Sequence, residues 1–121
     1  MDYVMYLFVN ENLKMGKGKI GAQIGHCVQY LIEDILENTL ENTLENIKKE
    51  KYQDYLKWKN SGCKKIVLKA SILELLQLQK NDISRSVYDA GHTQIEAGSL
   101  TIVGFFPSNK LGNKFTNFKL L

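Results

Sequence analysis

The sequence predicts an α/β domain in which helices cover a mixed β-sheet. Continuous apolar runs rich in aromatic and β-branched residues alternate along the chain with segments whose apolar residues recur every three or four positions. The first run, at 3–9, is followed by Asn-Glu-Asn and predicts a strand that is buried on both faces. Strands that alternate with helices favour layered α/β folds, and 121 residues are enough for one domain, so we expect a single domain over 1–121.

Three segments have helical periodicity and are predicted as helices: 19–40, 51–60 and 71–80. The apolar residues of the first segment form one stripe of a 3.6-residue repeat. Gly62 follows the second segment and is typical of a helix C-terminus. Ser71 and Glu74 have the spacing of a capping box, which predicts where the third helix begins.

Further strands are expected at 66–68, 86–89 and 100–106, and the terminal 118–121 is another candidate. The segment 100–106 ends at Pro107, the only proline of the chain. Proline has no N–H to donate to a neighbouring strand, so it sets a boundary for this strand.

The formal net charge of +3 averages over segments of opposite sign. Residues 1–30 carry +1, residues 31–56 carry −4 and residues 57–121 carry +6. The net value alone does not indicate a nucleic-acid partner. The distribution is more informative, because it predicts an acidic segment beside a basic remainder.

Residues 37–46 repeat the tetrapeptide Glu-Asn-Thr-Leu. A period of four places Leu40 and Leu44 on one helical face and stacks glutamates on another, where like charges repel. Asn and Thr are also indifferent helix formers, so a helix here should be marginal unless the leucine face is buried. We interpret the repeat as a helical insertion or connector, and a functional acidic arm is the alternative.

Several function classes are excluded by what the sequence lacks. Cys27 and Cys63 have no metal-ligand spacing, and there is no nucleophile elbow or zinc-binding His-Glu-x-x-His. His26 adjoins Cys27, but neighbours on a helix point about 100° apart, so a catalytic Cys–His pair is a poor fit. No apolar run reaches the ~18 residues of a membrane span, and no signal-peptide pattern is present. We therefore expect a cytoplasmic protein without membrane association or a metal.

Residues 15–23, Met-Gly-Lys-Gly-Lys-Ile-Gly-Ala-Gln, lie at the start of a predicted helix, where backbone N–H groups and the helix dipole favour an anion. Gly16, Gly18 and Gly21 match the dinucleotide pattern Gly-x-Gly-x-x-Gly. That pattern normally turns directly off a strand, whereas six residues separate Val9 from Gly16. A nucleotide-binding oxidoreductase is thus a weak alternative, and the motif indicates a basic glycine-rich loop suited to phosphate.

A second motif, Asp-Ala-Gly-His-Thr-Gln-Ile at 89–95, follows a predicted strand. One carboxylate, one imidazole, one hydroxyl and one amide gather on a glycine loop, a common place for sites in α/β sheets. An ordinary turn, in which Asp89 and Thr93 bind the local backbone, accounts for the same residues equally well.

Together the two motifs resemble type 2 peptidyl-tRNA hydrolase, the archaeal and eukaryotic kind. The segment 15–23, His26, the lysine-flanked strand at 63–70, the motif at 89–95 and the strand at 100–107 follow in the same order and spacing. The resemblance covers essentially the whole chain. It implies a three-layer α/β/α domain with a four-stranded mixed sheet, a possible homodimer, and hydrolysis of the ester between peptide and tRNA. It implies no cofactor and no metal.

The resemblance assigns functional residues position by position. It implies catalytic roles for Lys19, Asp89 and Thr93, and substrate binding by Lys17, Gln23, His26, His92 and Gln94. Hydrolysis of an already activated ester requires positioning, a group that orients or deprotonates water, and a cation for the developing oxyanion. We expect Asp89 to orient or deprotonate water, and Thr93 to hold Asp89 or the substrate. Lys19 stabilises negative charge on the ester or holds the terminal phosphate of the tRNA.

The sequence departs from the family pattern at three places. His92 stands where the family usually has Arg, and imidazole is shorter and largely neutral at pH 7. Gly21 and Gly25 add two glycines to the first helix. The stretch from His26 to Gly62 is about a dozen residues longer than expected, about three units of the tetrapeptide repeat. These departures leave a non-catalytic tRNA- or RNA-binding or regulatory module as the alternative function.

Overall fold

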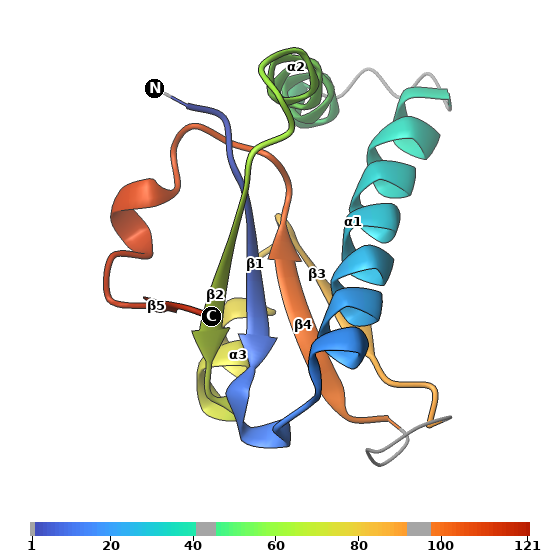
Figure 1. Ribbon diagram of the computed structural model, residues 1–121. Coiled ribbons are helices and arrows are strands. Elements are labelled where there is room, and N and C mark those ends of the chain that lie inside the picture. Colours follow the sequence, from blue (N-terminus) through green and yellow to red (C-terminus); the bar gives the residue numbers. More distant parts are fainter. Residues whose placement is uncertain (1, 41–45, 92–97) are drawn as a thin grey trace.

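The predicted α/β fold is confirmed by a computed structural model, which describes residues 2–40, 46–91 and 98–121 (Figure 1). Its five strands are β1 (Met5–Asn10), β2 (Lys65–Ala70), β3 (Ser84–Tyr88), β4 (Leu100–Phe105) and β5 (Lys119–Leu120). They form one mixed sheet in the order β3-β4-β1-β2-β5. β1 and β2 are parallel, and the other neighbouring pairs are antiparallel. β3 therefore runs parallel to β1, and their carboxyl ends lie at the same edge of the sheet.

Helices on both sides of the sheet produce three layers (Figure 1). The helices are α1 (Lys17–Leu40), α2 (Asn46–Asn60) and α3 (Ile72–Leu78), with 3-10 turns η1 (Glu11–Leu13) and η2 (Gly112–Lys114). Residues of α1 and α2 share one apolar cluster with one face of the sheet, and α3 joins a second cluster on the opposite face. Within the described part of the chain, no helix combines the length and apolar character needed to cross a membrane.

The apolar run at the N-terminus forms the central strand, β1, and all six of its residues are buried. Successive side chains of a strand point to opposite faces. Leu7 and Val9 accordingly join the cluster under α1 and α2, whereas Tyr6 and Phe8 join the cluster on the side of α3. A strand covered on both faces has no need of polar alternation, which explains the continuous apolar run.

α1 packs closely on β4 because Gly104 has no side chain. A Cβ atom at this position would lie 2.4 Å from Cys27 Sγ and 2.9 Å from a methyl group of Leu7. Cys27 is fully buried, and burial raises the pKa of its thiol to about 12. Cys27 is therefore a small packing residue, as expected, and its neighbour His26 is exposed.

Several element boundaries differ from the sequence-based prediction. The capping box of Ser71 and Glu74 is present, but α3 ends at Leu78. α2 begins at Asn46, five residues earlier than predicted, and β3 begins two residues earlier, at Ser84. The resemblance implied four strands. The fifth, β5, is a two-residue strand that pairs with the edge of β2. It lies within the candidate strand at 118–121.

The tetrapeptide repeat begins on α1. Residues 37–40 form the last turn of this helix, whereas residues 41–45 lie outside the described residues. With a rise of about 1.5 Å per residue, Glu37 is roughly 27 Å along the helix from Lys19. The described beginning of the acidic repeat and the glycine-rich motif thus occupy opposite ends of α1.

Candidate active site

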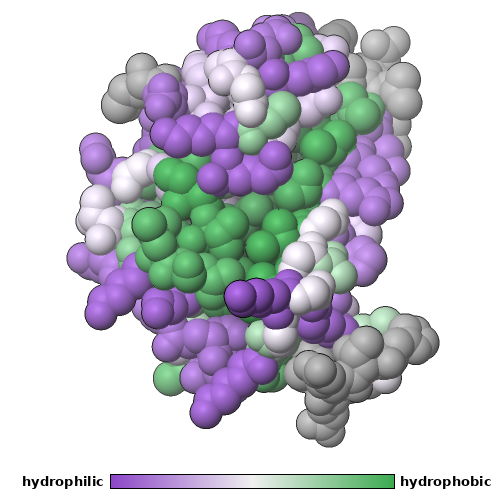
Figure 2. All heavy atoms as spheres, in the orientation of Figure 1, coloured by the Kyte–Doolittle hydropathy of each residue, from purple (hydrophilic) through white to green (hydrophobic). Residues whose placement is uncertain are grey.

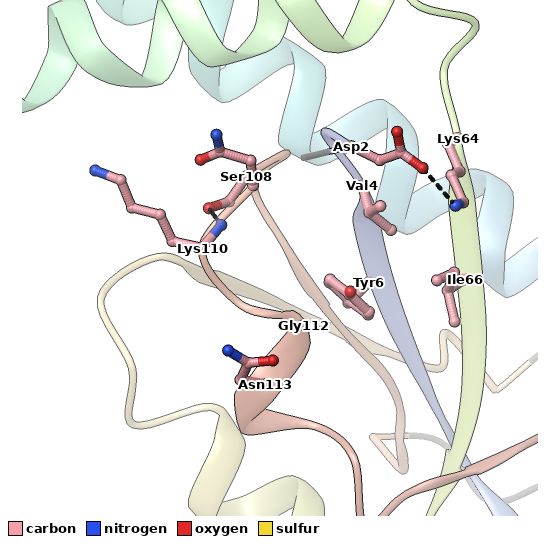
Figure 3. Close-up of a pocket in the computed structure, with 10 residues that line it drawn as sticks. Asp2, Val4, Tyr6, Lys64, Ile66, Ser108, Lys110, Gly112 and Asn113 are labelled. Atoms are coloured by element: carbon pink, nitrogen blue, oxygen red, sulfur yellow. Dashed lines mark hydrogen bonds and ion pairs between the residues drawn. The ribbon is translucent and has the colours of Figure 1, made fainter.

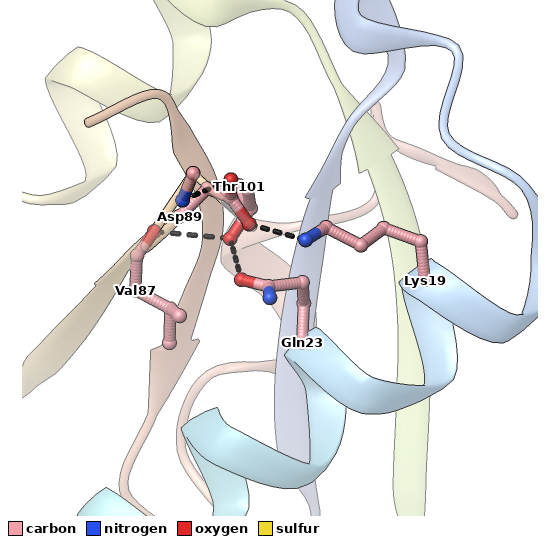
Figure 4. A network of polar contacts seen from close by, with 6 residues as sticks. Lys19, Gln23, Val87, Asp89 and Thr101 are labelled. Atoms are coloured by element: carbon pink, nitrogen blue, oxygen red, sulfur yellow. Dashed lines mark hydrogen bonds and ion pairs between the residues drawn. The ribbon is translucent and has the colours of Figure 1, made fainter. Parts of the chain in front are cut away.

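The carboxyl ends of β1 and β3 and the first turn of α1 bring the two sequence motifs together. Lys19 lies in the first turn of α1, which begins with an N–H of Ile20 donated to the carbonyl of Gly16 at 3.0 Å. Asp89 directly follows β3. The Lys19 ammonium donates to Asp89 Oδ1 and forms an ion pair with it (Figure 4). Only 12% of the Lys19 side chain and 1% of the Asp89 side chain are exposed, so the pair is buried.

The Asp89 carboxylate is held by the backbone of its own loop as well as by Lys19. Its Oδ2 accepts an N–H from Gly91 at 2.8 Å. The Asp89 N–H donates to the carbonyl of Ser99 at 2.8 Å, and the Asp89 carbonyl accepts from Gly98 at 2.9 Å. Gly91 and Gly98 have φ angles of 84° and 83°, in the left-handed region that favours glycine. Gly91, inside the second motif, therefore binds the carboxylate directly, and Gly98, just after the motif, binds the backbone of Asp89.

Gln23 joins α1 to β4 beside the ion pair (Figure 4). Its side-chain Oε1 accepts a hydrogen bond from the Thr101 hydroxyl at 2.7 Å, and this hydroxyl lies 3.1 Å from the carbonyl of Val87. Gln23 is 5% exposed and Thr101 is fully buried. Sequence reasoning missed Thr101, although a threonine inside the apolar run 100–106 was a signal for a buried polar contact. The resulting bond sets the distance between α1 and β4 at the site.

The ion pair faces an open pocket of about 930 Å³. Its lining residues are Gly16, Gly18, Lys19, Ala22, Gln23, His26, Tyr30, Tyr88, Asp89 and Ala90. Of the predicted site residues, the structure brings Lys19, Gln23, His26 and Asp89 together here. Lys17 is exposed and does not line the pocket. Thr93, His92 and Gln94 lie outside the described residues.

Two aromatic residues of the pocket were not predicted. Tyr30 lies one helical turn after His26 on α1, and Tyr88 ends β3 next to Asp89. The four-residue spacing from His26 to Tyr30 was the available signal, since such residues are neighbours on a helix surface. Tyr88 is 55% exposed, and its hydroxyl donates to Gln79 Oε1 at 2.9 Å.

A second hollow, of about 250 Å³, lies near the amino end of β1 (Figure 3). Val4, Tyr6 and Ile66 line it together with two lysines, Lys64 and Lys110. Each lysine forms an exposed ion pair, Lys64 with Asp2 at 3.0 Å and Lys110 with Glu50 at 2.9 Å. The two hollows thus differ in the burial of the charges that line them.

The chemistry available in the larger pocket is that of a cation and a carboxylate. An ammonium group has three donor hydrogens, so Lys19 can donate a hydrogen bond to a substrate oxygen. A charge that is shielded from water stabilises a developing opposite charge more strongly than an exposed one does. Residues 2–40, 46–91 and 98–121 contain no group of three His, Cys, Asp or Glu side chains that could hold a metal ion.

The chain is similar to proteins of one family over nearly its whole length. The model of the family described as "Peptidyl-tRNA hydrolase PTH2" matches residues 3–121. A protein named peptidyl-tRNA hydrolase from Methanococcus vannielii is 35% identical over 128 residues, which cover 98% of this chain and 99% of the relative. One of the same name from Metallosphaera sedula is 35% identical over 127 residues, 97% of this chain and 98% of the relative. One from Sulfolobus acidocaldarius is 36% identical over 110 residues, 85% of each chain.

Proposed function

The chain belongs to the peptidyl-tRNA hydrolase PTH2 family, and we propose that it hydrolyses the ester of peptidyl-tRNA with Lys19 and Asp89 at the reacting centre. The products are free peptide and free tRNA. The observation that supports this assignment of residues is the buried ion pair, which faces the pocket of about 930 Å³.

Lys19 is the group that meets the ester carbonyl. Its side chain is the more exposed of the pair, at 12% against 1% for Asp89. When water attacks the carbonyl carbon, the carbonyl oxygen becomes an oxyanion, and the Lys19 ammonium moves from the carboxylate to this oxygen. The movement uncovers Asp89 Oδ1, which takes a proton from the attacking water.

The tetrahedral intermediate then breaks its bond to the ribose oxygen. The proton held by Asp89 passes to that oxygen, which leaves as the 3′-hydroxyl of the tRNA, and the peptide leaves with a new carboxyl group. Water is the only co-reactant, and Asp89 returns to its ionised form beside Lys19. Thr93 belongs to the same proposal: its hydroxyl holds Asp89 or the substrate during this sequence.

The decisive experiment measures release of peptide from an N-blocked aminoacyl-tRNA. We expect wild-type protein to turn over and Asp89→Asn to lose at least about 100-fold in kcat/KM, because the amide cannot accept the proton. Glu50→Gln is the matched control, since Glu50 is also a carboxylate paired with a lysine but lies outside the pocket. A wild-type protein without turnover above background contradicts the proposal.

A non-catalytic module would give a different result in the same assay. Such a protein binds tRNA without cleaving the ester, and the two features that suggested it were His92 in place of the usual Arg and the acidic repeat. The family match favours the hydrolase. We propose that His92, Gln94 and Lys17 contact the tRNA, and their alanine variants should raise KM while kcat stays near the wild-type value.

Binding of tRNA is expected to be mainly electrostatic and therefore sensitive to salt. Residues 57–121 carry a net charge of +6, and Lys14 and Lys17 add charge on either side of Gly16 in the sequence. The acidic repeat begins at the far end of α1, about 27 Å from Lys19 by helix rise, which keeps its described part away from the substrate. We propose a cytoplasmic role that supports translation by recycling tRNA.

We also propose that the chain forms a homodimer, for which an uncovered apolar surface is the support. Figure 2 shows apolar side chains gathered over β1, β2 and the adjacent side of α1. The partly buried hydrophobic residues of the cluster under α1 and α2 include Ile24, Val28 and Val67. Sedimentation equilibrium should give a dimer mass, and Ile24→Glu should shift it toward the monomer. A wild-type monomer at tens of micromolar would contradict this part of the proposal.

A further inference from the structure

The side chains along one edge of α1 increase in size from one end of the pocket to the other. Gly18, Ala22, His26 and Tyr30 follow one another at every fourth position, and all four line the pocket. Side chains four residues apart lie above one another on a helix. The edge therefore has two positions with almost no side chain, followed by two aromatic rings.

The two rings are stacked, and the Tyr30 ring has a further contact that holds it. The ring planes of His26 and Tyr30 are 12° apart, and their centroids are separated by 6.1 Å. The Arg85 guanidinium lies 5.1 Å from the centroid of Tyr30, and Asp34 holds this guanidinium through two bonds of 2.7 and 2.9 Å. Rings that are positioned before a ligand arrives lose little conformational entropy on binding. His26 is the exposed end of this arrangement.

The space beside His26 is open and lies close to the ion pair. A Cβ atom at Gly18 would meet nothing within 4 Å, and Ala22 is exposed and contributes only a methyl group. Lys19 follows Gly18 in the chain, at a rise of about 1.5 Å along the helix, so this space begins directly beside the residue that is proposed to meet the ester. A planar aromatic group that occupies the space above Gly18 and Ala22 would contact the His26 ring.

We infer that His26, above the small surface of Gly18 and Ala22, stacks on the 3′-terminal adenine of the tRNA. The inference rests on the proposed function. The ester is carried by the ribose of the terminal nucleotide, so the base of that nucleotide must lie one sugar away from the reacting carbonyl. Proteins bind unpaired bases by stacking them on aromatic side chains. A peptide side chain is the competing occupant, but it varies between substrates, whereas the terminal adenine is the same in all of them.

Variants at two positions test the stack with an N-blocked aminoacyl-tRNA as substrate. His26→Ala should raise KM roughly tenfold or more with kcat changed less than about threefold. His26→Phe should restore KM, because phenyl stacks but neither titrates nor forms hydrogen bonds. Ala22→Leu should raise KM by filling the space. Gln29→Leu is the control for an added leucine on an exposed position of α1 outside the pocket, and should leave KM unchanged. Failure of His26→Phe to restore KM overturns the stacking role.

A substrate without the terminal base separates this inference from the proposed function. The probe is the same aminoacylated tRNA with an abasic terminal ribose that still carries the ester. Wild-type protein should show a KM about tenfold higher for this probe, and His26→Ala should not distinguish the two substrates. Equal KM values for wild type overturn the stacking inference and leave the hydrolase intact. A KM that follows the peptide side chain instead assigns the space to peptide and also overturns it. Hydrolysis of neither substrate overturns the proposed function and the inference with it.

Discussion

Two kinds of lysine–carboxylate pair occupy opposite ends of the sheet. Lys19 and Asp89, at the carboxyl ends of β1 and β3, have side chains that are 12% and 1% exposed. Lys110 and Glu50, near the amino end of β1, are 71% and 58% exposed. The partners are 70 residues apart in the chain in the first pair and 60 in the second, so both depend on the tertiary fold.

The two pairs have the same residue types and differ in burial. Water and ions screen an exposed pair, which then contributes little. The buried pair keeps a strong local field, and it faces a pocket large enough for a substrate. The first turn of α1 and the loop after β3 create this difference, because they cover the carboxylate on both sides.

The largest expected difference between the two pairs is in catalysis. Lys19→Gln should lower kcat/KM for N-blocked aminoacyl-tRNA by about 100- to 1,000-fold, since the oxyanion loses its cation. Lys110→Gln removes the same charge from an exposed pair that lies outside the pocket of Lys19. Its kcat/KM should stay within about twofold of wild type. Equal losses in both variants would mean that general attraction of tRNA, and not transition-state stabilisation, is the role of Lys19.

The second expected difference is in stability. Asp89→Asn leaves the Lys19 ammonium with no counter-charge in a site that is 12% exposed, and should lower the free energy of unfolding by roughly 3 kcal/mol. Glu50→Gln should leave the free energy of unfolding unchanged, because both partners of its pair are exposed. Urea denaturation followed by circular dichroism measures both. A stable Asp89→Asn would show that the site relaxes around the unpaired lysine.

A smaller effect concerns the glycines of α1. Gly21 and Gly25 are exposed in the interior of the helix, and a Cβ at either position would meet nothing within 4 Å. Gly21→Ala and Gly25→Ala should each stabilise the protein by about 1 kcal/mol. Gly104→Ala should instead destabilise it by roughly 1–3 kcal/mol, because its methyl would collide with Cys27. Thermal melts of the three variants give the order, and loss of stability in Gly21→Ala would indicate that the pocket end of α1 needs its glycine.

Much of the fold could be predicted from local sequence. The apolar run of β1 and the capping box at Ser71 reflect interactions between near neighbours, and both appear in the structure. The two-residue strand β5 was only a candidate, because its pairing depends on an edge of β2 that lies far away in the chain. The start of β3 was misplaced since Ser84 and Arg85 are polar, and only their pairing with β4 makes them a strand.

The candidate site was predictable in its residue types but not in its geometry. The sequence motifs pointed to Lys19 and Asp89, and the resemblance gave them roles. Neither the motifs nor the resemblance predicted that the two side chains are buried and in contact. Lys64 and Lys110 belong to the same basic segment, 57–121, and their exposed acidic partners are visible only in the structure. The Tyr30 ring was missed because its significance comes from its stacking with His26.

The smallest expected effect is in the titration of the exposed pair. The hydrogen bond and charge of Lys110 hold the pKa of the Glu50 carboxyl below its usual 4.5, and Glu50 in turn raises the pKa of Lys110. A lowered carboxyl pKa stabilises the folded state above the unfolded pKa, and this contribution disappears as pH falls through the folded pKa. The small contribution of the pair to stability is therefore fully present between about pH 4.5 and the usual lysine pKa of 10.5. It is lost as the pH falls through the lowered pKa of Glu50 or rises through the raised pKa of Lys110. In an NMR titration, Lys110→Gln should return the pKa of Glu50 toward 4.5 while activity at neutral pH is unchanged. An unchanged pKa would mean that solvent already screens the pair completely, which would widen its contrast with Lys19 and Asp89.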